Sequence, residues 1–90
     1  MRYYIDIINM LSNYNNARVY FREGKSLKEA LLELLPLKAK GYIVFVKGDN
    51  TLTLKELEEG IEVLNTKDVL YGGTIDNTLS DREVMVIALD

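Results

Sequence analysis

Val84-Met85-Val86-Ile87-Ala88-Leu89 is the stretch that decides the fold, because every position in it is apolar. Apolar side chains at both odd and even positions are typical of a strand that is covered on both faces inside a sheet. The segment Gly41–Gly48 (GYIVFVKG) has the same character. The two runs therefore predict two inner strands, around which the rest of the chain supplies further strands and helices.

The N-terminal part of the chain predicts a β-hairpin. Residues 2–11 are rich in Tyr and Ile, which is a strand composition. Residues 17–22 alternate, and the side chains expected to point inward are those of Ala17, Val19 and Phe21. A polar cluster between the two runs has the composition of a turn, so we expect two strands joined by a short connection.

A helix is predicted over residues 26–35. Ser26 and Glu29 stand at the two positions of a capping box, which satisfies free amide donors at the start of a helix. Apolar residues then recur at helical spacing and form one stripe, made of Leu27, Ala30, Leu31, Leu34 and Leu35. Pro36 ends the helix, because the residue before a proline is disfavoured in the helical conformation.

A second, short helix is predicted near residues 54–64. Thr53 and Glu56 repeat the capping-box spacing. Gly60 weakens a helix by about 1 kcal/mol, so residues 60–64 are left open between helix and short strand.

The order of these elements predicts an α+β protein with the β-grasp (ubiquitin-like) fold. A further short strand is expected at residues 68–71, ahead of a glycine pair, and the last strand follows it. In a β-grasp the first and last strands of a mixed sheet lie side by side and parallel, and the main helix crosses one face. No helix is expected between the first two strands, which argues against the ferredoxin-like order. A single domain is expected to span residues 1–90, since this length suits one domain.

The composition narrows the chemistry. With 48% hydrophobic and 28% charged residues, the chain has the proportions of an ordinary globular protein. It contains no His and no Cys, which removes thiolate nucleophiles, imidazole bases and ordinary structural zinc sites. We therefore expect no cofactor and no metal, and the lack of Cys most simply indicates the cytoplasm. No apolar run approaches the ~18 residues that span a bilayer, so we expect no membrane association.

Charge is distributed unevenly along the chain. The net charge of −3 combines +4 over residues 1–48 (eight Lys and Arg, four Asp and Glu) with −7 over residues 49–90 (three Lys and Arg, ten Asp and Glu). The acidic balance argues against nucleic acid as a partner. A protein partner or a homodimer is expected instead.

Two segments carry a resemblance to a known family. Gly41–Gly48 looks like the third strand of the β-grasp sulfur carriers, the molybdopterin-synthase small subunit and the thiamin carrier. Leu79–Leu89 (LSDREVMVIAL) resembles the turn and final strand of the same family, with Arg82 where the family usually has Gly. The resemblance implies a ubiquitin-like fold. It would also imply a C-terminal Gly-Gly tail whose carboxylate is adenylated, but this sequence ends Ala88-Leu89-Asp90, so sulfur transfer is not expected of the chain as it stands.

Two groups of residues are candidate sites. Arg18, Tyr20 and Arg22 alternate along one strand and predict a basic, aromatic patch that binds a protein, because Arg and Tyr are favoured at interface hot spots. The alternative is a solvated strand face. Gly72 and Gly73 form the chain's single glycine pair, which could become a carrier tail after processing, although a turn is the simpler interpretation.

The leading functional hypothesis is a non-catalytic protein-interaction or scaffold module, and not an enzyme. The alternative is a sulfur carrier or protein modifier that needs processing or a divergent use of the fold. A third hypothesis, a small enzyme that uses carboxylates, rests on a cluster of glutamates near the second helix, made of Glu56, Glu58, Glu59 and Glu62.

Overall fold

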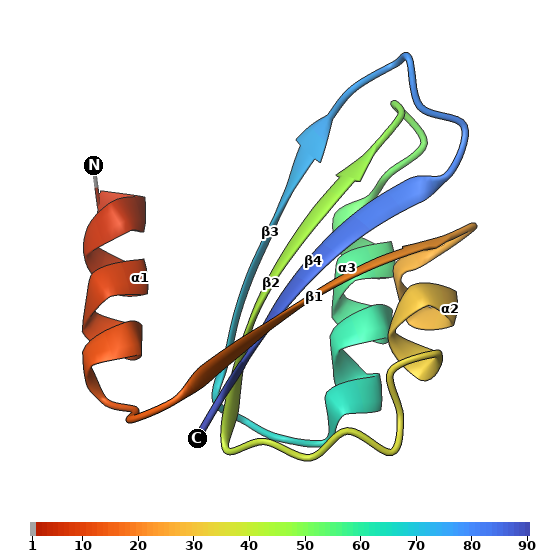
Figure 1. The fold of residues 1–90 in the computed structure, drawn as a ribbon. Coiled ribbons are helices and arrows are strands. Elements are labelled where there is room, and N and C mark those ends of the chain that lie inside the picture. Colours follow the sequence, from red (N-terminus) through yellow and green to blue (C-terminus); the bar gives the residue numbers. More distant parts are fainter. Residues whose placement is uncertain (1) are drawn as a thin grey trace.

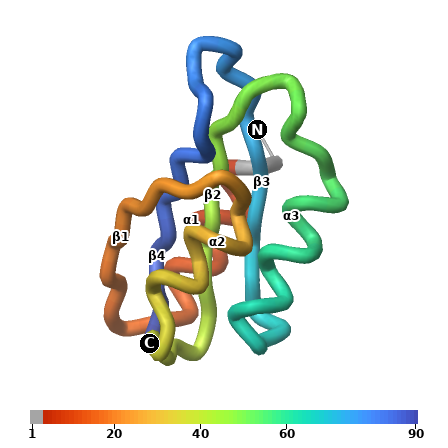
Figure 2. The backbone as a smooth tube through the Cα atoms, turned by 90° about the vertical axis from the view of Figure 1, so that its right-hand side faces the viewer, coloured from red at the N-terminus to blue at the C-terminus, as the bar shows by residue number. Residues whose placement is uncertain are grey.

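Figure 1 shows the protein as a computed structural model, which describes residues 2–90, and side chains from residue 4 onward. A four-stranded sheet lies in the middle, with two helices on one face and a third helix on the other side (Figures 1 and 2). The elements in chain order are α1 (Arg2–Ser12), β1 (Ala17–Gly24), α2 (Leu27–Leu32), β2 (Gly41–Gly48), α3 (Leu54–Ile61), the 3-10 helix η1 (Glu62–Leu64), β3 (Val69–Ile75) and β4 (Arg82–Leu89). Residue 1 of the predicted domain lies outside the described range.

The last strand in sequence is an inner strand of the sheet, as its apolar run predicts. The sheet order is β1-β4-β2-β3, and β4 pairs antiparallel with both β1 and β2. β2 is the other inner strand and pairs parallel with β3. The side chains of Val86 and Ile43 are fully buried, one on each face of the sheet. The prediction of two inner strands is therefore confirmed.

The predicted β-grasp fold is wrong, because residues 2–11 form a helix and not a strand. The first strand of the structure is β1, and it runs antiparallel to β4, whereas a β-grasp requires a parallel pair of first and last strands. The helical spacing of the apolar residues in this segment, and not its strand-like composition, agrees with the structure. The exposed apolar side chains Tyr4, Ile5, Ile8 and Leu11 recur at i, i+1, i+4 and i+7, which is helical periodicity.

The burial of β1 is opposite to the prediction. Val19 and Phe21, expected inside, are 52% and 69% exposed, whereas Tyr20 is half-buried against the core. Strict alternation fixes which residues share a face but not which face is covered. In this fold α2 and α3 cover the even-numbered side of β1.

Both capping residues predicted from the sequence are confirmed. The Ser26 hydroxyl oxygen accepts a hydrogen bond from the Glu29 amide at 3.2 Å, and the Thr53 hydroxyl oxygen accepts one from the Glu56 amide at 3.2 Å. α2 ends at Leu32, which is earlier than the predicted end at residue 35. Residues 60–64 complete α3 and η1, so they are helical rather than a strand.

The core lies between the sheet and the α2–α3 layer. Leu27, Ala30 and Leu31 of α2 are completely buried, and Leu57 of α3 is nearly so. They pack against the even-numbered residues of the inner strands, which are Tyr42, Val44, Val46, Val84, Val86 and Ala88. Burying a side chain of this size contributes about 1.5–3 kcal/mol, so this layer carries most of the stability.

Candidate interaction surface

The face of the sheet opposite α2 and α3 carries two cross-strand rows of side chains. In the first row Phe21, Met85 and Phe45 stand side by side on β1, β4 and β2. In the second row Glu23, Glu83 and Lys47 occupy the same three strands. Residues that are register partners share one face, so the sheet presents an apolar row beside a charged one.

An open groove of about 740 Å³ follows these two rows, and all six of their side chains line it. Phe21 is 69% exposed, the highest value among the exposed large apolar side chains. Exposed apolar surface rimmed by charged groups is typical of a protein-binding site. This surface could have been expected from the sequence. β2 and β4 have apolar residues at both odd and even positions, so both faces of these strands need a cover.

α1 adds apolar surface on the same side of the sheet (Figure 1). Its side chains Tyr4, Ile5 and Ile8 are 63%, 55% and 63% exposed. Ile7 and Met10 are half-buried, so the helix has one partly covered and one open apolar side. A surface helix of a globular protein usually turns mainly polar side chains to water, whereas α1 exposes these apolar side chains as well as Asp6 and Asn9.

The predicted Arg18, Tyr20 and Arg22 patch lies on the other face of β1 and is largely occupied within the chain. Arg18 forms an ion pair with Asp90 at 2.9 Å and donates to the Lys38 carbonyl oxygen at 3.3 Å. The Arg22 guanidinium lies 5.8 Å from the centre of the Tyr20 ring. The structure brings the three residues together, and their role in binding a protein stays a prediction.

Gly72 and Gly73 lie inside β3, opposite Phe45 and Val46 of β2. The sequence suggested that the glycine pair ends a strand, but in the structure the strand continues to Ile75. A Cβ atom on Gly73 would stand 3.2 Å from Leu52 Cδ2, which leaves little room for a side chain. Gly73 therefore allows close packing between β3 and the segment before α3.

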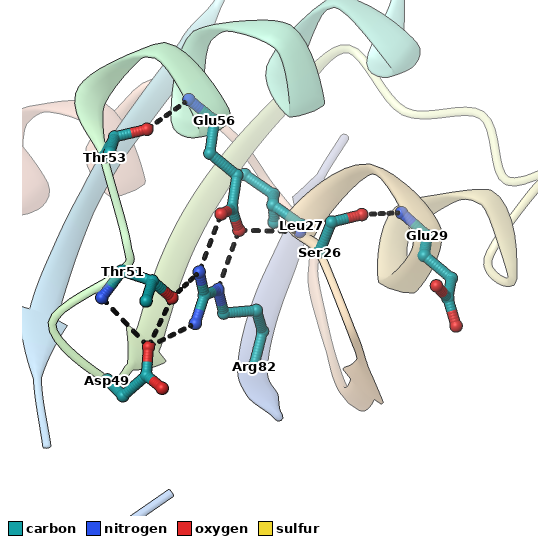
Figure 3. A network of polar contacts seen from close by, with 8 residues as sticks. All are labelled: Ser26, Leu27, Glu29, Asp49, Thr51, Thr53, Glu56 and Arg82. Atoms are coloured by element: carbon teal, nitrogen blue, oxygen red, sulfur yellow. Dashed lines mark hydrogen bonds and ion pairs between the residues drawn. The ribbon is translucent and has the colours of Figure 1, made fainter. Parts of the chain in front are cut away.

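A buried polar network joins the loop after β2 to α3 and β4 (Figure 3). Arg82 is only 5% exposed. Its guanidinium donates to both carboxylate oxygens of Glu56, to Asp49 at 3.1 Å and to the Thr51 hydroxyl at 3.0 Å. Glu56 also accepts from the backbone amide of Leu27 at 3.2 Å, which ties in the start of α2. The sequence analysis missed this network, and one available signal was the Arg at the start of a largely apolar strand.

The electrostatics of this network favour its charged form. Hydrogen bonding from Arg82 holds the pKa of Glu56 below its ordinary value, against the opposing effect of burial. Hydrogen bonds from Thr51, with a contribution from Arg82, lower the pKa of Asp49. Glu56 is thus a structural partner of Arg82, which removes it from the proposed catalytic glutamate cluster. Within residues 2–90, no group of three or more acidic side chains is arranged to hold a metal ion.

None of the helices that residues 2–90 form is both long enough and apolar enough to cross a lipid bilayer.

Comparisons with known proteins find a relative in sequence and similar solved structures. It is 30% identical, over 93 aligned residues, to the mitochondrial division protein fszB of Dictyostelium discoideum, and the match covers 84% of this chain and 25% of that protein. An FtsZ dimer structure from M. jannaschii matches 97% of this chain and 30% of the FtsZ chain, with a TM-score of 0.80 and 24% identity. A point mutant of the same FtsZ matches 97% of this chain and 31% of its own, with a TM-score of 0.74 and 23% identity. No protein-family model matches.

These likenesses correct the predicted kinship. The fold is that of the C-terminal domain of FtsZ, and the predicted relation to ubiquitin-like sulfur carriers is wrong. The two hypotheses built on that kinship, a sulfur carrier and a generic ubiquitin-like scaffold, fall with it. The chain spans between a quarter and a third of the length of the proteins it matches.

Proposed function

We propose that this chain is an assembly domain of an FtsZ-like division protein, and that it acts by holding protein surfaces together without catalysing a reaction. The open sheet face carries the proposal. Its groove joins the exposed Phe21 of β1 to the half-buried Phe45 of β2 and Met85 of β4, and α1 presents a second apolar surface beside it. Surfaces of this kind are stable in water when another protein surface covers them.

The similar proteins indicate what kind of partner this chain would bind. The chain resembles a quarter of a protein named for mitochondrial division, and about a third of FtsZ. We infer that the groove and α1 contact another part of such a division protein, and that the partner is protein rather than nucleic acid or membrane. A cytoplasmic location belongs to the same proposal, and the absence of Cys supports it.

A domain exchange tests this function. The matching segment of M. jannaschii FtsZ is replaced by residues 1–90 of this chain, and the chimera is examined by calorimetry and sedimentation. If the groove contacts the rest of the protein, the chimera unfolds in one coupled transition and retains dimer formation. Two independent unfolding transitions, with the inserted domain folded and the chimera monomeric, would contradict the proposal.

A matched pair of variants shows whether the groove is responsible. Met85→Glu introduces a charge into the apolar row of the groove, and in the chimera it is expected to separate the two transitions. Glu59→Gln, on the exposed side of α3, is expected to leave them coupled. Equal behaviour of the two variants would point to a contact elsewhere.

A further inference from the structure

β1 is an edge strand, and its outward-facing backbone groups can be identified. Asn16 and Asp90 exchange two hydrogen bonds, of 2.9 Å and 3.0 Å. In an antiparallel ladder such reciprocal pairs recur at every second residue, so the even-numbered residues of β1 bond to β4. The backbone N–H and C=O groups of Val19, Phe21 and Glu23 therefore point away from the sheet.

This edge carries the charged side chains of Arg18, Arg22 and Glu23, but it lacks most of the other devices that usually prevent strand pairing. β1 is eight residues long, contains no Pro, and pairs with β4 in unbroken register from Ala17 to Gly24. Natural edge strands are commonly short, bulged, covered or interrupted. The outward Phe21 carbonyl oxygen accepts a hydrogen bond from the Arg22 guanidinium at 2.8 Å. A surface side chain of this kind can be displaced without unfolding the strand.

We propose that β1 pairs antiparallel with β1 of a second copy of this chain, so that two sheets join into one across a two-fold axis. This inference goes beyond the proposed function, because it concerns the edge of the sheet and not its open face. A second copy is the fitting occupant, since the sequence of β1 is complementary to itself in one register.

The charges of β1 distinguish two registers that differ by one residue at the axis. If Tyr20 lay on the axis, Arg18 would stand opposite Arg22 of the partner subunit, and like charges placed opposite each other are destabilising. If Phe21 lies on the axis, the two Phe21 rings meet on the groove side. On the other face Tyr20 then stands opposite Arg22 of the partner subunit. This cation–aromatic pair repeats between subunits the contact that Arg22 makes with Tyr20 inside one chain.

The opposite edge of the sheet is less suited to pairing. β3 holds Gly72 and Gly73 at its centre, and glycine weakens strands because it has no side chain to pack. The β3 edge therefore serves as an internal control in the experiments on β1.

Sedimentation equilibrium of three proteins tests the proposal. Wild type is expected to form a dimer. Val19→Pro is expected to be monomeric, because it removes an outward N–H that the ladder with β4 does not use, and proline is tolerated there on an edge strand. Val19→Ala keeps the N–H and is expected to remain dimeric. A monomeric wild type at concentrations up to about 1 mM, or a folded Val19→Pro variant that dimerises like wild type, would overturn the proposal.

If Val19→Pro does not fold, cross-linking of a different variant tests the pairing of β1 with β1. The chain has no Cys, so a single introduced thiol reports one contact. Two Phe21→Cys residues on the axis would have Cα atoms about 5.5 Å apart, within disulfide range. Phe21→Cys is expected to form a covalent dimer on mild oxidation, at least tenfold faster than Ile75→Cys on the β3 edge. Equal rates, or no cross-link for Phe21→Cys, would count against pairing through β1.

Discussion

Arg82 and Glu56 face each other with two parallel hydrogen bonds, each of 2.8 Å, from Nε to Oε2 and from Nη2 to Oε1. The arginine begins the strand β4, and the glutamate lies in the first turn of α3. Their contact joins the central strand to the helical layer on one side of the sheet (Figure 3). A bidentate pair of this kind fixes orientation as well as distance.

Arg82→Met is expected to destabilise the protein by about 3–5 kcal/mol, because it leaves the partly buried Glu56 carboxylate without its main partner. Urea unfolding measures the loss. The double variant Arg82→Met, Glu56→Leu is expected to regain much of it, since replacing both members of a buried pair costs far less than replacing one. A double variant no more stable than Arg82→Met would show that the carboxylate is not the cause.

The stability of the Arg82–Glu56 contact should depend on pH. The folded state holds the pKa of Glu56 below its ordinary value of 4.5, so the unfolded state takes up a proton first as the pH falls. The stabilisation is complete above the ordinary value and is lost as the pH falls through it toward the lowered one. The stability difference between wild type and Glu56→Gln is therefore expected to be large at pH 7 and to shrink below pH 4.5.

Unfolding curves at several pH values between neutral and acidic conditions measure this difference. Glu59→Gln serves as the control, because its pair with Lys55 is exposed and 3.8 Å long. Exposed pairs contribute about 0–1 kcal/mol, so its effect should stay small throughout. A wild-type advantage over Glu56→Gln that grows in acid would contradict the assigned direction.

Gly60→Ala is expected to destabilise α3 even though alanine is the better helix former. A Cβ atom at this position would stand 2.5 Å from Leu27 Cγ, and Leu27 is completely buried in the core. Helix propensity gains about 1 kcal/mol from this change. Overpacking a tight core costs about 1–3 kcal/mol, so we expect a net loss.

Thermal unfolding distinguishes the packing effect from propensity. Adding Leu27→Ala to Gly60→Ala should reduce the cost of the alanine at position 60, because the two nearest atoms, Leu27 Cγ and Cδ2, are gone. Glu58→Ala, an exposed position of the same helix, provides the reference for propensity alone. An additive double variant would show that Gly60 and Leu27 do not interact.

The corrected faces of β1 and β4 predict unequal effects for two similar substitutions. Val86 is completely buried and Val19 is 52% exposed, although both lie in adjacent strands of one sheet. Val86→Ala is expected to cost about 1.5–3 kcal/mol, and Val19→Ala much less. Chemical denaturation of the two variants gives the comparison, and equal losses would restore the burial pattern expected from the sequence.

Local signals in the sequence were sufficient for much of the fold. The caps at Ser26 and Thr53 depend on contacts three residues apart, so the chain itself specifies them. The apolar runs of β2 and β4 likewise required inner positions in a sheet. Element type in these regions did not depend on knowing the topology.

What depends on distant contacts could not be predicted. The error at residues 2–11 was local instead, because their Tyr and Ile content suggested a strand although their apolar residues have helical spacing. For β1, the sequence showed alternation but not which side the helices would cover. The Arg82–Glu56 contact joins residues 26 positions apart, and no local sequence pattern predicts that these two residues are partners.

Because β4 lies between β1 and β2, the ribosome delivers the middle of the sheet after its flanks. Until residues 82–89 emerge, β1 has no neighbouring strand, and β2 can pair only with β3. In nascent chains this segment should therefore stay protease-sensitive until residues 82–89 have emerged, and then close in a single cooperative step.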